Sequence, residues 1–255
     1  MTDPRLVVTA SPHLTAGDST PHIMWQVVAS LMPVVLAGAW FFGISALLVV
    51  LASTIGAVLA ERGFGRPGTV SDWSAVITGL LLGLTLPAGM PMWMAFLGAV
   101  FGIGLGKLVF GGLGYNVFNP ALVGRAFLQA AFPVAITTWP AAGGGFWTLR
   151  GDTFALPGFR AVTDAVTSAT PLGLLKFEGK GTALGSLVLG STGGSIGETA
   201  AVVILLCGAY LAWRRYLNWR IPLGIFATVA LLSAIIHAVD PRKPDAPFML
   251  FSGGL

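Results

Sequence analysis

Two long stretches without charged side chains limit what this chain can fold into. Residues 23–60 and 73–106 contain no Asp, Glu, Lys or Arg. Charged residues make up 9% of the whole chain, against about 25% in typical soluble domains. The mean hydropathy is +0.83. In lipid, a helix satisfies its own backbone polar groups, so the sequence predicts an all-α integral membrane protein.

Breaks within these stretches predict a polytopic helical bundle of about seven transmembrane helices. One crossing takes about 20 residues, so residues 23–60 form two helices with a break near residues 40–43. The segment Pro87-Ala88-Gly89-Met90-Pro91 divides the second stretch, because proline interrupts a helix. A fifth helix is expected over residues 120–133, and two more over residues 196–213 and 221–238.

The basic residues between the helices predict the orientation of the chain. Arg62, Arg66, Arg214, Arg215 and Arg220 all fall on one side if the helices alternate in direction. The positive-inside rule makes that side cytoplasmic. The expected order is a cytoplasmic arm (1–22), five helices (23–136), an extracytoplasmic loop (137–195), two helices (196–239) and an extracytoplasmic tail (240–255).

The long loop contains the small polar segment DAVTSATP at residues 164–171. Taken alone, it could be a Ser/Thr-rich surface turn. It also resembles the flavinylation motif D-x-x-(S/T)-(S/G)-A-T, in which the last Thr carries FMN bound covalently through its phosphate. The resemblance implies that Thr170 is the attachment residue and that Asp164, Thr167, Ser168 and Ala169 form the rest of the motif.

Other segments in the same order resemble the RnfD/NqrB family. They are SPH at residues 11–13, SDWSA at 71–75 followed by GLLLGLTLP at 79–87, and KLVFGGLGYNVFNPA at 107–121. The short amino-terminal arm is most similar to the RnfD members, which belong to the Rnf ion-translocating electron transport complex. Family members have ten helices in two inverted repeats. Residues 23–136 then correspond to the first repeat, residues 196–239 begin the second, and the tail leads to a missing span of a truncated chain.

The resemblance also implies a function. It indicates a multi-pass subunit in the bacterial inner membrane that carries electrons within a ferredoxin:NAD oxidoreductase complex and couples them to Na+ or H+ movement. The subunit would not be catalytic alone. The expected cofactor is covalent FMN, with riboflavin or a second, noncovalent flavin as a further option. Expected partners are the membrane, flavin and iron-sulfur subunits, a flavin transferase and the lipid bilayer, with no nucleic acid. With one cysteine and three histidines, the sequence offers no case for a metal site.

Three alternatives stay open. Asn119 before Pro120 could face a second flavin or an ion path at a broken helix, or could simply start a helix. Lys107 lies near membrane depth, where function is suspected, but its ammonium group is more easily placed by snorkelling to the interface. The whole chain could instead be a small-solute channel or transporter of related fold. The motif at residues 164–170 favours the redox subunit, because a channel does not need a flavin attachment site.

Overall fold

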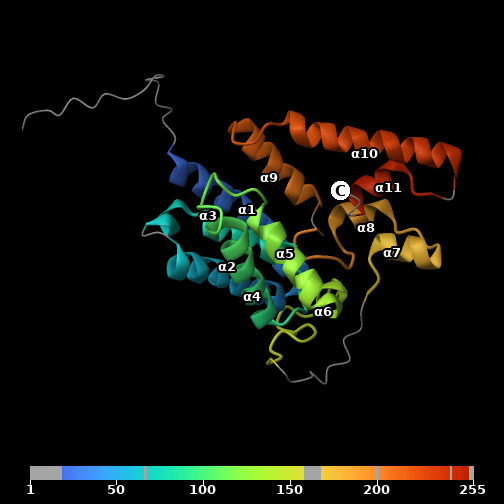
Figure 1. The fold of residues 1–255 in the computed structure, drawn as a ribbon. Coiled ribbons are helices and arrows are strands. Elements are labelled where there is room, and N and C mark those ends of the chain that lie inside the picture. Colours follow the sequence, from blue (N-terminus) through green and yellow to red (C-terminus); the bar gives the residue numbers. More distant parts are fainter. Residues whose placement is uncertain (1–18, 66–67, 158–167, 199–200, 242, 253–255) are drawn as a thin grey trace, which may run out of the picture.

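The computed structural model describes residues 19–65, 68–157, 168–198, 201–241 and 243–252. Within those ranges the regular elements are all helices, and none is a β-strand (Figure 1). The predicted all-α class is therefore confirmed. Each of the seven apolar segments expected to be helical contains at least one helix.

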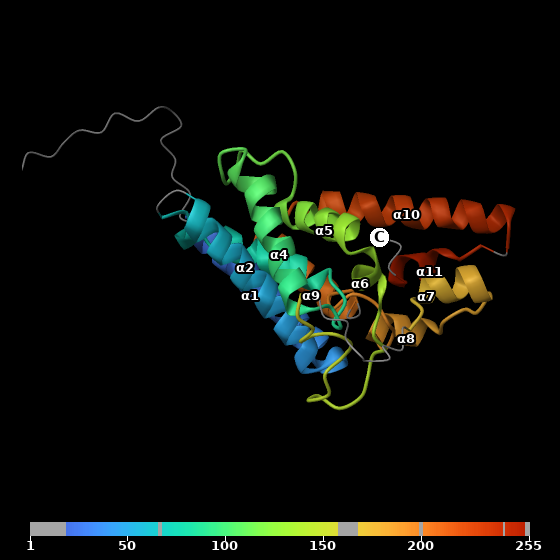
Figure 2. The ribbon, with the colours of Figure 1, turned by 60° about the horizontal axis from the view of Figure 1, so that its bottom comes forward.

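The first five helical segments pack together as one bundle. They are α1 (Thr20–Phe42), α2 (Ile44–Phe64), α3 (Ser74–Leu84), α4 (Met92–Ile103) and α5 (Pro120–Ala131). A 3-10 helix, η1 (Thr69–Asp72), precedes α3, and the π-helix η2 (Gly104–Leu108) continues α4. Helix α2 packs against α3 and α4, and α4 packs against α5. Figures 1 and 2 show these helices side by side. Their buried apolar side chains form the core of the protein.

A glycine makes the predicted break between the first two helices. Gly43 has φ 71°, a value that L-residues with a side chain rarely adopt. Its backbone N–H donates to the carbonyl oxygen of Ala39 at 2.8 Å and so ends α1. A Cβ atom at Gly43 would lie 2.5 Å from the carbonyl oxygen of Phe146. The break therefore allows both the turn and the close approach of the long loop.

The remaining helices are α6 (Pro133–Thr137), α7 (Pro171–Gly173), α8 (Leu184–Leu189), α9 (Ala201–Trp213), α10 (Arg220–Val239) and α11 (Ala246–Phe251), and the π-helix η3 (Leu174–Glu178) continues α7. Helix α9 contacts α1, whereas α11 contacts both α8 and α10. Figures 1 and 2 show α10 and α11 close together. The segment expected to be a long loop thus contains helical turns of its own at residues 171–178 and 184–189.

Three of the described helices are long and apolar enough to cross a membrane: α1, α2 and α10. Shorter apolar helices occupy Ser74–Leu84, Met92–Leu108 and Ala201–Trp213. Only 6% of the most apolar window of α10 is buried within the protein, and its exposed side chains include Leu231, Leu232, Ile235 and Ile236. This pattern is that of a polytopic membrane protein, because lipid or another protein can cover such a face.

Close contact between α2 and α3 depends on Gly79. A Cβ atom there would lie 2.4 Å from the Cα atom of Thr54, and the Ser53 hydroxyl donates to the Gly79 carbonyl oxygen at 2.7 Å. We expect Gly79→Ala to destabilise the protein by about 1–3 kcal/mol through overpacking. The matched control is Gly63→Ala in α2, where no heavy atom lies within 4 Å of the added Cβ. Thermal unfolding in detergent should show a lower Tm for Gly79→Ala alone, and equal Tm values would contradict the packing argument.

Candidate functional site

Thr170 lies at the start of the helical segment in the long loop. Its backbone is extended, with φ −66° and ψ 156°, as expected for a residue that precedes proline. Its Oγ1 atom accepts a hydrogen bond from the backbone N–H of Gly173 at 3.2 Å. The side chain is half-buried, whereas the next residue, Pro171, is buried. The threonine thus acts as an N-cap of α7 and is held in place by its neighbours.

Contacts with two distant segments fix the chain before Thr170. The backbone N–H of Ser168 donates to the carbonyl oxygen of Trp139 at 2.8 Å, and the Ser168 hydroxyl donates to the same oxygen at 3.3 Å. Gly193 leaves room for this hydroxyl, because a Cβ atom at residue 193 would collide with Ser168 Oγ. Ala169 is exposed. Two of the predicted motif residues, Asp164 and Thr167, lie outside the described residues.

A small recess opens beside Thr170. Its free volume is about 20 Å³, and its lining includes Thr192, Gly193, Glu198 and Ser252. The Glu198 carboxylate accepts hydrogen bonds from the hydroxyl and the backbone N–H of Ser195, at 3.0 and 3.4 Å. A volume of this size is close to that of one water molecule. The recess can therefore hold about one water molecule and is far too small for a fused aromatic ring.

Asn119 begins α5. Its Oδ1 atom accepts a hydrogen bond from the backbone N–H of Ala121 at 2.9 Å, and Pro120 occupies the first helical position. The residue is exposed. This geometry supports the helix-start interpretation. A role for Asn119 in binding a second flavin or an ion stays a prediction.

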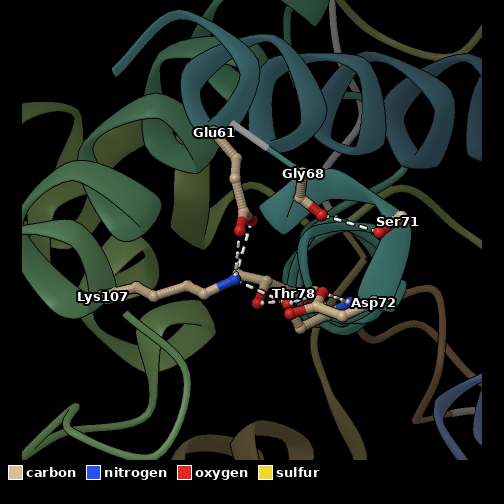
Figure 3. Close-up of polar contacts among 7 residues, drawn as sticks. Glu61, Gly68, Ser71, Asp72, Thr78 and Lys107 are labelled. Carbon is tan, nitrogen blue, oxygen red and sulfur yellow. Dashed lines mark hydrogen bonds and ion pairs between the residues drawn. The ribbon is translucent and has the colours of Figure 1, made fainter. Parts of the chain in front are cut away.

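A buried ion pair joins the ends of the two charge-free stretches (Figure 3). The Lys107 ammonium group donates to both carboxylate oxygens of Glu61, at 2.6 and 2.7 Å. Glu61 is 0% exposed and Lys107 is 2% exposed. The prediction that Lys107 snorkels to the interface is therefore wrong. The carboxylate provides a counter-charge inside the bundle, so the ammonium group does not have to reach water.

Two further side chains extend this pair into a polar chain. Lys107 also donates to the Ser74 hydroxyl at 2.5 Å, and that hydroxyl in turn donates to Asp72. Asp72 also accepts from the backbone N–H of Ser74, the first residue of α3, at 2.8 Å. The network connects the last turn of α2, the start of α3 and η2. Sequence reasoning missed it, although Glu61 and Lys107 are the charged residues that directly follow the two uncharged stretches.

Known proteins resemble this chain over nearly its whole length. The model of the NQR2, RnfD, RnfE family matches residues 7–255. The chain is 37% identical to the D component of the proton-translocating ferredoxin:NAD(+) oxidoreductase complex of Clostridium ljungdahlii, over 97% of this chain and 75% of the relative. It is 39% identical to the D component of the Na(+)-translocating ferredoxin:NAD(+) oxidoreductase complex of Acetobacterium woodii, over 94% and 72%. It is also 38% identical to the D component of the ion-translocating oxidoreductase complex of Stutzerimonas stutzeri, over 93% and 73%.

Proposed function

Since the chain belongs to the NQR2, RnfD, RnfE family, we propose that it is the RnfD-type membrane subunit of an Rnf ferredoxin:NAD oxidoreductase complex. In this role it carries electrons through FMN bound covalently to Thr170 and helps to couple their flow to Na+ or H+ transport. The observation that carries the proposal is the similarity to the D components of such complexes over more than nine tenths of the chain.

The surroundings of Thr170 fit a phosphoester at its hydroxyl oxygen. The side chain is half-buried and the preceding Ala169 is exposed, so this edge of the loop is partly accessible. Oγ1 makes one long hydrogen bond, as an acceptor from Gly173, and an ester oxygen can still accept it. Bound FMN would supply a ring that accepts one or two electrons.

Attachment needs a partner enzyme, because a threonine hydroxyl is a weak nucleophile without activation. In the proposed step a flavin transferase removes the hydroxyl proton, and Thr170 Oγ1 forms a bond to the FMN phosphorus of FAD. The bond between the two phosphates breaks and AMP leaves. Ser168 and Ala169 are small, which lets this segment enter the cleft of a transferase.

The proposed location is the bacterial inner membrane, with the amino terminus in the cytoplasm and the Thr170 loop outside. Arg62 in the last turn of α2, Arg214 and Arg215 just after α9, and Arg220 at the start of α10 support this orientation. The other subunits of the complex would exchange electrons with the flavin. A second, noncovalent flavin near Asn119 is part of the same proposal.

The direct test is to look for covalent flavin. The full chain would be co-expressed with a flavin transferase, separated on a denaturing gel and viewed for flavin fluorescence. A fluorescent band is expected, and mass spectrometry should find FMN, less one water, on the peptide containing Thr170. A dark band, with the transferase active on a control substrate, would contradict the proposal and favour the channel interpretation.

A further inference from the structure

A large cavity is lined by both neighbours of Trp139, the residue that contacts Ser168 of the attachment segment. Its volume is about 800 Å³, compared with about 20 Å³ for the recess at Thr170 itself. The start of α4 contributes Met94, and the junction of α5 and α6 contributes Phe132 and Val134. Thr138 and Arg150 add polar groups to the lining. Unlike the recess, this cavity is large enough for a tricyclic ring.

A hydrogen bond connects the attachment segment to the cavity. Ser168 donates to the carbonyl oxygen of Trp139, and the two neighbours of Trp139, Thr138 and Pro140, both line the cavity. Thr170 lies two residues beyond Ser168, which is at most about 7 Å of extended chain. A group tethered to Thr170 by a flexible linker therefore starts close to the cavity.

The apolar part of the lining suits a flat aromatic ring. Phe132 provides an aromatic wall and packs edge-on against Trp93, with ring centroids 5.3 Å apart. Met94 and Val134 extend this wall with apolar side chains. Aromatic rings pack favourably against such surfaces, so the wall can hold the dimethylbenzene side of a flavin.

The polar part of the lining suits the other side of the same ring. The Arg150 guanidinium donates to the carbonyl oxygens of Phe42, Ala141 and Gly143, which hold it in place. A fixed cation can stabilise the negative charge that develops on a flavin when it is reduced. Asp152 also lines the cavity, and a carboxylate can accept a hydrogen bond from the imide N–H of the ring.

A second cavity provides a comparison. It has a volume of about 640 Å³, and its lining includes Trp40, Phe41, Phe146 and Ser191. Among the described residues that line it, three are aromatic and none carries a charge. The first cavity combines apolar walls with a held cation, and it is lined by both neighbours of Trp139, whose carbonyl oxygen accepts from Ser168, so it is the better match of the two.

We propose that the isoalloxazine ring of the flavin on Thr170 docks in the cavity formed by Met94, Phe132, Val134, Thr138 and Arg150. This inference rests on the proposed attachment at Thr170. It assigns a noncovalent ring site to residues that lie 20 or more positions before the attachment point. The ring then lies between an aromatic wall and a cation.

Filling the cavity tests the proposal. Val134 is 77% exposed and lines the cavity, so Val134→Trp should place an indole in the space proposed for the ring without disturbing the core. Flavin fluorescence of the folded, labelled protein in detergent would be measured against iodide concentration. We expect a severalfold steeper quenching slope for Val134→Trp, because the displaced ring becomes accessible. Leu149→Trp, at another lining residue that is 49% exposed, should give the same result.

Two control variants keep the outcomes distinct. Val239→Trp, at an exposed residue at the end of α10, should leave the quenching slope unchanged. Ser191→Trp fills the second cavity, and a steeper slope for this variant alone would overturn the assignment. Unchanged slopes for both Val134→Trp and Leu149→Trp, with full flavin fluorescence on a denaturing gel, would also overturn it while leaving attachment at Thr170 intact. A wild-type band without flavin fluorescence on the denaturing gel would instead contradict the proposed function itself.

Discussion

Thr170→Val is expected to abolish covalent flavin completely while leaving the protein folded in the membrane. Valine has nearly the same shape as threonine but offers no oxygen for the phosphoester. The change removes one hydrogen bond, from Gly173 to Thr170 Oγ1, and losing such a cap costs about 1 kcal/mol. Flavin fluorescence on a denaturing gel measures the attachment, and the amount of protein in the washed membrane fraction measures insertion.

Thr192→Val is the matched control. Thr192 lines the same recess, so this variant makes the same chemical change at the site and keeps the attachment hydroxyl. It should label as strongly as the wild-type protein. If Thr170→Val keeps its fluorescence and the FMN is found on Thr167 or Ser168, the attachment residue has been assigned wrongly. If the variant is lost from the membrane fraction, the placement of Thr170 at an accessible loop edge is wrong.

Local features of the site could be predicted from the sequence, whereas its surroundings could not. The extended conformation of Thr170 follows from the proline after it, and its place in the motif follows from spacing. The recess depends on Thr192 and Gly193, which are more than 20 residues away. The contact between Ser168 and Trp139 spans a similar distance. No periodicity in the sequence indicates which parts of a Gly-, Ser- and Thr-rich loop will meet.

The same distinction holds for the fold. Charge-free apolar stretches predict helices because lipid leaves few alternatives, and Gly43 is confirmed as the break in the first stretch. The short helical turns at residues 171–178 and 184–189 were not predicted, because their composition is typical of a loop. The sequence also does not show that η2 brings Lys107 against α2. Only the packing of α2 against α4 and η2 explains why this lysine is buried.

That burial predicts a large stability effect. Glu61→Gln should lower the free energy of unfolding by about 3–5 kcal/mol, because it leaves the Lys107 charge buried without its counter-charge. Lys107→Met should have a comparable effect by leaving the Glu61 carboxylate unpaired. Thermal unfolding of the purified protein in detergent would record both effects as a fall in Tm.

The double variant Glu61→Gln with Lys107→Met separates charge burial from general packing damage. It removes both charges and keeps similar side-chain volumes. Because isosteric replacement of a buried pair is often neutral, it should regain much of the unfolding free energy that either single variant loses. Glu178→Gln is the control for an exposed pair, because the side chains of Lys180 and Glu178 are 74% and 48% exposed; its Tm should hardly change. Additive losses in the double variant would contradict the argument, because they would mean that the two residues stabilise the bundle independently. Recovery would show that the two charges can lie inside the bundle because they are paired. The pair lies at the junction of α2, α3 and η2, a contact that the apolar stretches alone do not specify.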